Sequence, residues 1–553
     1  MGTLLELDLT RGVLETPPGS PLAAFRARHL PTLRELVHAL RKGAEDESVV
    51  GLVAHLGGPA LSLAQTQELR AAVVAFRAAS GKPTVAWTES FGEVGGGTVP
   101  YYLATAFEEI WVQPSGELGV TGVSVQATFL RGALDKAGVI PQFGKRREYK
   151  TAADTFTEKE MTGPGREMAA RLAESAYEQI VEGIAEGRRL EQPRVRELVD
   201  SAPLSVEASQ EAGLIDRIGY RSDVYDELHK RFGEDMRPLL AERYHRRGPR
   251  SVHEALDSLP WPQKPVVAVV RVSGGIVVGR NSGGGPVGGP RAGSDTITAA
   301  LRTVAEDDKV KAVVLRVDSP GGSYAASDAI RHEVLRLRAT GKPVIASMGS
   351  VAASGGYFVA MPADVVVAQP GTITGSIGVL SGKGVVRDAL GRIGITSEAV
   401  SEGENARMYS AQEEFSTEQW ERLEQTLDRI YADFVAKAAQ DRGLPEDRLE
   451  SLARGRVWTG ADAHKHHLVD ELGGFEQALQ RACVRAGLDR ENIAVTIAPH
   501  RTLVDRLRPP TTTDDLAVTT QPLTIDGLKH SLYTALGLPP TGALTMPLTW
   551  HLS

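Results

Sequence analysis

The stretch AEDDKVKAVVLRVDSPGG, residues 305–322, decides the fold, because a close copy of it, AEDESVVGLVAHLGG, occupies residues 44–58. Each of these two segments is followed by helix-like sequence and then by the tripeptide GKP. Further matches follow in the same order: YYLATAFEEIWVQPSGELGVTG (101–122) with YFVAMPADVVVAQPGTITGSIG (357–378), and GLIDRIG (213–219) with HLVDELG (467–473). The chain therefore contains two copies of one unit, each about 260 residues long.

Within each copy, short β-branched runs alternate with stretches of helical periodicity. The runs are VVGLVAHL and PTVAWTE in the first copy, and KAVVLRV and PVIASM in the second. This alternation predicts an α/β fold in which parallel strands are joined by crossover helices. Each copy also has a long helical stretch, at 166–187 and 417–443, with Thr162 and Ser416 as candidate N-caps.

These patterns divide the chain into three parts. We expect the first repeat at 1–245, the second repeat at 246–490 and a C-terminal tail at 491–553. The sequence HRRGPRSVHEALDSLPWP (245–262) is interpreted as the linker between the repeats. The tail is rich in threonine and proline (RPPTTTDD, LPPTGALTMPL), so we expect it to be loosely packed.

The composition excludes several classes of protein. With 553 residues, 42% hydrophobic and 24% charged, the chain resembles an ordinary folded protein. Its net charge of -8 argues against nucleic acid as the main partner.

The single cysteine, Cys483, cannot form an intrachain disulfide and suits a reducing compartment. No signal peptide or transmembrane segment is recognisable, so we expect a cytoplasmic or peripherally membrane-associated protein.

A candidate nucleophile lies in the second copy, where the strand PVIASM leads into GSVAASGGYFVAMPAD. This places Ser354 at a strand-to-helix turn, followed by Gly355 and Gly356. Unpaired amide hydrogens and the helix dipole favour negative charge at such a position. The glycines would let a substrate backbone approach closely. The alternative is that Ser354 is only the N-cap of a helix before a glycine turn.

A second glycine turn, DSPGGS (318–323), follows another strand of the same copy. The amides of Gly321 and Gly322, together with Gly355 beside the serine, are candidates for an oxyanion hole. The alternative is an ordinary Pro-Gly turn.

A serine hydroxyl needs a base to become a nucleophile. His332 lies in a helical run, SDAIRHEVLRLRATG, and is expected at the surface. The chain has no HExxH, paired CxxC or phosphate-loop motif, so we expect no metal and no organic cofactor.

Lys150, in the first-copy segment GKRREYKTAADTF, is the remaining candidate base. Lys150 is useful as a base only if burial and nearby positive charge lower its pKa. Lys145, Arg146 and Arg147 lie close in sequence and could contribute such charge, while Glu148 would oppose it. The alternative is an exposed lysine in a basic loop.

Four motifs together resemble the signal peptide peptidase A family in its long, double-repeat form. They are the YKTA segment of the first copy and DSPGG, AASGGYF and TGSIGV (374–379) of the second. The resemblance covers roughly residues 1–490. It implies two tandem crotonase-like or Clp-like repeats and a peptidase that acts on remnant signal peptides in or near the membrane. It also implies a homo-oligomer, a dome-like tetramer.

The resemblance assigns roles to three residues of this chain. Ser354, the serine of ASGGY, is implied as the nucleophile, and Lys150 of the first repeat as the general base. Ser376, the serine of TGSIG, is implied to hydrogen-bond the lysine and orient it.

The two copies have diverged in a way that fits this assignment. Thr98 is aligned with Ser354, so the first copy lacks the nucleophile. The second copy has no lysine between Lys383 and Lys437, so it lacks the base. Each copy is missing what the other supplies, which favours a Ser-Lys serine endopeptidase.

Two other functions remain as alternatives. A crotonase-type acyl-CoA enzyme would also use strand-end glycines as an oxyanion hole, but it would need a carboxylate near them. A non-catalytic, membrane-associated scaffold would need no reactive serine at all.

Overall fold

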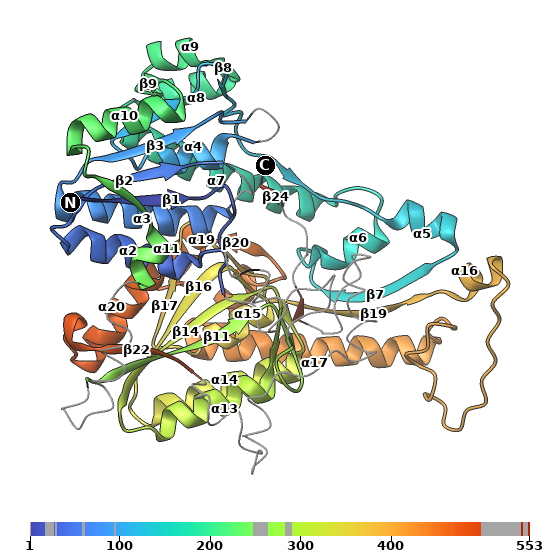
Figure 1. The fold of residues 1–553 in the computed structure, drawn as a ribbon. Helices are drawn as coiled ribbons and strands as arrows, with labels where there is room; N and C mark the ends of the chain where they lie inside the picture. Colours follow the sequence, from blue (N-terminus) through green and yellow to red (C-terminus); the bar gives the residue numbers. More distant parts are fainter. Residues whose placement is uncertain are drawn as a thin grey trace.

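The computed structural model describes residues 2–16, 27, 30–57, 61–92, 96–246, 264–282 and 290–498, together with the short strands at 544–545 and 551–552. Each copy of the repeat forms its own parallel sheet, and the two sheets lie one above the other (Figure 1). The predicted α/β fold, with two tandem repeats, parallel strands and crossover helices, is confirmed.

The sheet of the first repeat has six strands in the order β10-β1-β2-β3-β4-β9. Every neighbouring pair is parallel, as expected for apolar strands that are connected through helices. Their bounds are β1 (Thr3–Asp8), β2 (Val49–His55), β3 (Thr84–Thr88), β4 (Glu109–Val112), β9 (Arg217–Ile218) and β10 (Arg237–Leu240).

The sheet of the second repeat has the corresponding order, β22-β11-β14-β16-β17-β21, and its neighbours are also parallel. In addition, the far end of β16 pairs with β18, which pairs antiparallel with β20, so the sheet splits there. The bounds are β11 (Val266–Ser273), β14 (Val310–Ser319), β16 (Val344–Ala353), β17 (Val365–Ala368), β18 (Ile373–Gly375), β20 (Val457–Thr459), β21 (Glu471–Leu472) and β22 (Ala494–Ala498).

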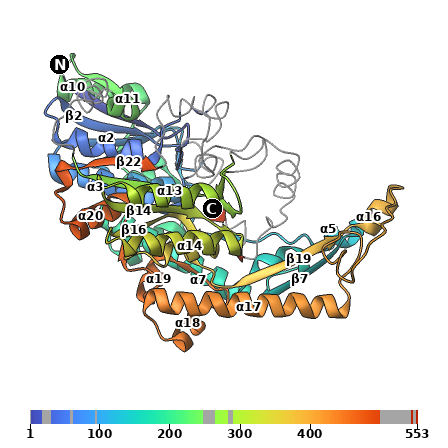
Figure 2. The same cartoon turned by 90° about the horizontal axis from the view of Figure 1, so that it is seen from below.

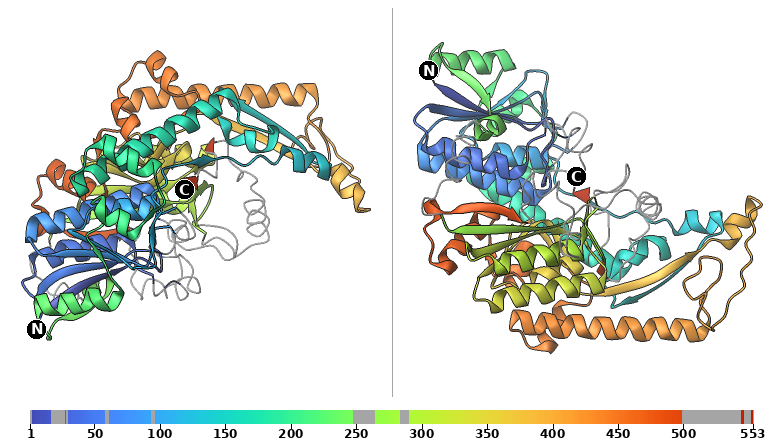
Figure 3. Two further views of the ribbon diagram at one scale, coloured as in Figure 1. Left: turned by 90° about the horizontal axis from the view of Figure 1, so that it is seen from above. Right: turned by 60° about the horizontal axis from the view of Figure 1, so that its bottom comes forward.

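Strand β14 shows why the second sheet is covered on both faces. Its residues Val313, Leu315 and Val317 belong to one core, and Ala312 and Val314 belong to another. Helices α13 (Ser294–Glu306) and α14 (Tyr324–Ala339) cover the first of these faces, and α20 (Phe475–Ala486) covers the second. Helices α2 (Leu33–Glu45) and α3 (Leu63–Ser80) lie between the two sheets (Figures 2 and 3).

Both predicted long helices are present. They are α7 (Gly163–Arg188) and α17 (Thr417–Arg442). The Thr162 and Ser416 side chains accept hydrogen bonds from the third helical amide of α7 and α17, respectively, which confirms them as N-caps.

One strand of each repeat contributes to an arm that projects from the body (Figure 1). Strand β7 (Ile140–Arg146) pairs antiparallel with β19 (Val379–Val385) over their full lengths. Helix α17 runs along this ribbon, and α5 (Arg131–Ala137) and α16 (Arg387–Arg392) lie near its tip (Figure 2). The arm carries the chain of the first repeat across to the second repeat just before Lys150.

The structure extends the packed part of the second repeat beyond the boundary expected at residue 490. Strand β22 (Ala494–Ala498) pairs with β11 as β10 pairs with β1 in the first repeat. The proposed linker, apart from its first two residues, lies outside the described residues, and so does the tail from 499 onward except for β23 (Leu544–Thr545) and β24 (His551–Leu552).

Candidate active site

Ser354 lies at a sharp turn between β16 and α15 (Gly355–Ala360). Its backbone has φ 54° and ψ -116°, a conformation that L-residues rarely adopt and that is typical of strained functional turns. Its amide donates to Gly375 O at 2.8 Å, which fixes the turn against β18. The Ser354 side chain makes no capping hydrogen bond, so the alternative of a simple helix cap does not describe it.

Lys150 reaches the serine from the first repeat. It precedes the 3-10 turn η1 (Thr151–Ala153) and is completely buried. Its Nζ lies 2.9 Å from Ser354 Oγ, and the two residues are 204 positions apart in the same chain. The predicted pair is therefore assembled within one chain, and the alternative of an exposed lysine in a basic loop is wrong.

The pKa of Lys150 is lowered to about 7 from its ordinary value, and the cause is burial. The suggested contribution of neighbouring positive charge to this low pKa is not found, because each neighbouring cation has its own acidic partner. Lys145 pairs with Asp154, Arg146 with carboxylates of α17, and Arg147 with Glu450. Burial alone therefore brings the lysine into the range of a base at neutral pH.

Ser376 holds the lysine from the other side. Lys150 Nζ lies 3.0 Å from Ser376 O and 3.0 Å from Ser376 Oγ. A neutral amine has two hydrogens and one lone pair. When both hydrogens are donated to Ser376, the lone pair is directed at the hydroxyl of Ser354.

The glycine turn lies beside the serine but offers one amide fewer than expected. The Gly321 amide donates to Ser319 Oγ at 3.2 Å, so it is engaged within the turn and the expectation that it is an oxyanion donor is not supported. The next amide nitrogen, of Gly322, lies 3.1 Å from the point that a Cβ on Gly355 would occupy. Gly322 and Gly355 therefore lie close together, and their amides remain the candidates for the oxyanion hole.

The turn itself is held by a residue that sequence reasoning missed. Ser319 is fully buried and donates its hydroxyl to Gly274 O at 2.7 Å while accepting from Gly321. A serine two positions before a glycine in a turn is the only sequence signal for this role. Gly322 (φ 153°) also needs to be glycine, because a Cβ there would lie 2.1 Å from Ile276 O.

The edge of the glycine turn accepts an extended segment of the chain itself. Gly321 and Gly322 form β15, and β23 pairs with β15 antiparallel, with Gly321 opposite Thr545 and Gly322 opposite Leu544. An extended segment of the chain therefore pairs with β15 close to Ser354, as in strand addition.

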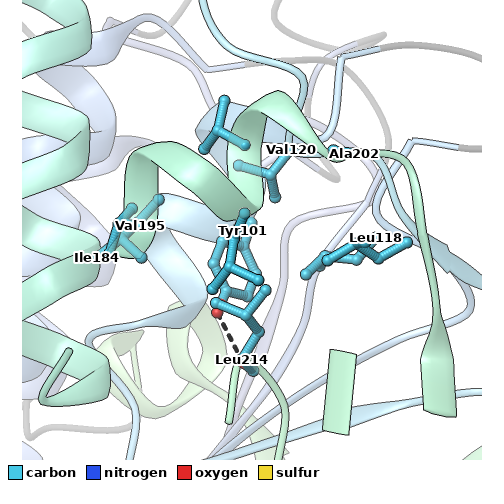
Figure 4. Close-up of a pocket in the computed structure, with 10 residues that line it drawn as sticks. Tyr101, Leu118, Val120, Ile184, Val195, Ala202 and Leu214 are labelled. Carbon is cyan, nitrogen blue, oxygen red and sulfur yellow. Dashed lines mark hydrogen bonds between the residues drawn. The ribbon is translucent and has the colours of Figure 1, made fainter. Parts of the chain in front are cut away.

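The first repeat has no serine at the positions that correspond to Ser354 and Ser376. Helix α4 (Thr98–Ala104) begins at Thr98, and the buried Thr98 hydroxyl accepts from the Gly122 amide at 3.2 Å. Val120 stands where the second repeat has Ser376. A small pocket next to α4 has an almost entirely apolar lining, and its one polar side-chain group, the Tyr101 hydroxyl, donates to Leu214 O at 2.7 Å (Figure 4). The pocket is lined by Tyr101, Leu118, Val120, Ile184, Val195, Leu198, Val199, Ala202, Leu204 and Leu214.

Among the described residues, no group of three or more His, Cys, Asp or Glu side chains is placed to hold a metal ion. Among the helices that the structure describes, none is long and apolar enough to cross a membrane.

A strained serine between a strand and a helix, a buried lysine in contact with its hydroxyl and glycine amides beside it are the features of a serine hydrolase, here on a duplicated α/β scaffold. Comparison with known proteins narrows this class. The model of peptidase family S49 matches residues 77–234 and 336–489, one segment in each repeat.

Similar proteins span most of the chain. The serine protease SPPA, chloroplastic, of Arabidopsis thaliana is 31% identical over 490 residues, which cover 88% of this chain and 69% of that protein. Protease 4 of Salmonella typhi is 30% identical over 466 residues, covering 83% and 72%. Protease 4 of Haemophilus influenzae is 31% identical over 477 residues, covering 83% and 74%. The chain belongs to peptidase family S49 and is a serine protease of this type.

Proposed function

We propose that the protein is an endopeptidase that hydrolyses peptide bonds through an acyl-enzyme, with Ser354 as nucleophile and Lys150 as general base. The observation that carries the proposal is the 2.9 Å contact between Lys150 Nζ and Ser354 Oγ in a fully buried setting. Ser376 is the positioning residue for the lysine, and the amides of Gly322 and Gly355 are the oxyanion donors.

The reaction follows from these positions. Neutral Lys150 takes the hydroxyl proton of Ser354 while Oγ attacks the substrate carbonyl carbon. The negative charge that forms on the carbonyl oxygen is stabilised by the two glycine amides and by the N-terminus of α15. The lysine ammonium then gives its proton to the departing amine, which leaves the acyl-enzyme. A water molecule, deprotonated by Lys150, releases the acid and restores the serine.

The proposed substrates are extended peptides, with remnant signal peptides as the physiological class. The pairing of β23 with β15 supports an extended, antiparallel mode of binding. The membrane-derived substrate class comes from the resemblance of the motifs to signal peptide peptidase A.

The acyl-CoA alternative is less well supported. It needs a carboxylate free to act at the glycine turn, and Asp318 is the carboxylate of that turn. The Asp318 side chain instead accepts a hydrogen bond from the Val351 amide at 3.1 Å and packs against Gly349. It is used to fix the end of β16, on which Ser354 depends.

Two further properties are proposed on the resemblance alone. They are a homo-oligomer, expected to be a tetramer, and a cytoplasmic or peripheral membrane location. Sedimentation of the purified chain measures the first, and recovery from membranes after a high-salt wash measures the second.

Labelling with a fluorophosphonate tests the proposed function directly. The wild-type chain should be labelled at Ser354, while Ser354→Ala and Lys150→Ala should lose both labelling and peptide hydrolysis and keep their fold by circular dichroism. A variant that retained activity within about tenfold of wild type, a loss of only ~1.4 kcal/mol of transition-state stabilisation, would exclude the role assigned to that residue. A scaffold protein would show no labelling above that of Ser354→Ala.

A further inference from the structure

A three-residue segment of the second repeat, Arg454–Arg456, contacts both the residue before Lys150 and Ser376, which accepts from the lysine amine. It lies between α18 (Glu446–Leu452) and β20. Arg454 O accepts from the Tyr149 amide at 3.2 Å, so the segment holds the residue directly before the lysine. Arg456 O accepts from the Ser376 amide at 2.7 Å, so the same segment also holds the serine that orients the lysine.

Gly455, in the middle of the segment, packs directly on the backbone of Lys150. A Cβ at Gly455 would lie 2.5 Å from Lys150 N, 2.7 Å from Lys150 Cα and 2.6 Å from Lys150 Cβ. These are contacts with the start of the lysine side chain and with its backbone, which cannot move away without moving Nζ. The Gly455 amide also donates to Ile377 O at 2.7 Å, which ties the glycine to the residue after Ser376.

The conformation of the segment is unusual and is fixed locally. Both Arg454 (φ 53°) and Gly455 (φ 82°) lie in the left-handed region. The Arg454 amide donates to the Tyr431 hydroxyl at 3.2 Å, and the Arg456 amide donates to Ala453 O at 2.8 Å. The side chains of the two arginines make ion pairs with Glu148 and Glu167 at the surface, where such pairs contribute little.

We propose that Arg454–Arg456 is a backbone clamp that sets the position of the general base, and that Gly455 is a positioning residue for Lys150. The clamp joins the two halves of the site, because the lysine comes from the first repeat and Ser376 from the second. Its action depends on a glycine that lets two backbones approach closely, not on the charged side chains around it. This inference rests on the proposed Ser354–Lys150 pair.

The test compares Gly455→Ala with Gly341→Ala. Gly341 has φ 84°, close to the φ of 82° at Gly455, but a Cβ at Gly341 would meet nothing within 4 Å. Both substitutions therefore place an alanine at nearly the same left-handed φ, and only the first one brings a Cβ against the lysine. We expect kcat of Gly455→Ala to fall about 100-fold relative to Gly341→Ala, as for a misplacement of about 1 Å.

The pH profile separates positioning from a general loss of structure. A displaced Lys150 is no longer held in its fully buried place, so the rising limb of the kcat/KM profile should move to higher pH in Gly455→Ala. Partial unfolding would lower the amplitude and leave the midpoint unchanged. A Gly455→Ala enzyme with the kcat and the pH midpoint of Gly341→Ala would overturn the proposal.

A second variant covers the case in which Gly455→Ala does not fold. Gly378 approaches the clamp from the other side, and a Cβ there would lie 2.8 Å from Gly455 Cα, with no left-handed strain at Gly378 itself. Gly378→Ala should shift the pH midpoint in the same direction, and an unshifted midpoint would count against the clamp. If Lys150→Ala kept its activity, the Ser-Lys proposal would fail; if Lys150→Ala were inactive while Gly455→Ala and Gly378→Ala behaved as Gly341→Ala, only the clamp would fail.

Discussion

Lys150 is protonated or neutral according to how strongly burial lowers its pKa. An exposed lysine would be protonated at neutral pH, whereas this one has a pKa of about 7. Only the neutral amine can take the serine proton, so kcat/KM should be low at pH 5, rise through about pH 7 and level off above it. A pH series between 5 and 9, with circular dichroism at each pH, measures this. A rate that falls over that range while the fold persists would contradict a lysine base.

Ser376 is proposed to act through the lysine, so we expect its loss to affect the rate more than the fold. Ser376→Ala removes one of the two acceptors that fix the amine hydrogens and leaves the Ser376 carbonyl in place. We expect kcat to fall about 10- to 100-fold, within the range for a misaligned proton transfer, and KM to change little. Ser416→Ala, which removes only the exposed N-cap of α17, is the control. Equal rates in both variants would mean that the TGSIG segment is only a turn.

At this scale the motifs predicted Ser354, Lys150 and Ser376, and the structure brings all three together. Burial was correctly named as a cause of the low lysine pKa, but the suggested contribution of nearby cations was not found, because proximity in sequence does not reveal which carboxylates pair with Arg146 and Arg147 across the fold. The engagement of the Gly321 amide was likewise hidden, since it depends on the rotamer of Ser319. Nothing in the sequence ARGRV distinguishes Gly455 from any other glycine near a helix end.

Among the elements, periodicity predicted the long helices α7 and α17 because each has a polar hydroxyl cap and an apolar face of its own. The pairing of β7 with β19 could not be predicted, since it joins segments more than 200 residues apart and neither strand alternates clearly. Strand β22 was missed for a different reason. Its short apolar run lies at the start of the segment assigned to the tail, which was interpreted from its threonine- and proline-rich composition.

Strand β23 lies where the proposed substrate strand would lie, so a peptide must displace it before binding. The double variant Leu544→Pro, Thr545→Pro removes both backbone donors of this strand and weakens its pairing with β15. We expect KM for a peptide substrate to fall while kcat stays the same, because Ser354 and Lys150 are untouched. Steady-state kinetics of the full-length chain provide the measurement, and an unchanged or higher KM would place β23 outside the binding edge.

For the whole molecule, the duplication found in the sequence accounts for most of the architecture. The two repeats form two sheets with the same strand order. Each repeat lacks the candidate catalytic residue that the other contains, which indicated a single site formed by both repeats. What the repeat pattern could not give is the geometry between the copies: the helices between the sheets and the arm that carries Lys150 to Ser354.

Lys150 and Ser354 of one chain lie in contact, so we expect each chain to hold a complete site, and a mixing experiment tests this. Lys150→Ala chains and Ser354→Ala chains, refolded together, should recover no activity, because no chain contains both residues. If lysine and serine met across an interface between neighbouring chains, random mixing would place both intact residues together at about a quarter of the sites. Activity near a quarter of wild type would therefore show a shared site and would leave Ser354 and Lys150 as the pair.

The joining of both repeats in one polypeptide also has a genetic consequence. When an active site lies between subunits, a defective subunit encoded by one gene copy also inactivates the site that it forms with an intact subunit. Here Lys150 and Ser354, the proposed base and nucleophile, are encoded in one gene and translated in one chain. A defective allele at either position should therefore behave as a simple recessive loss, with the remaining activity proportional to the number of intact chains.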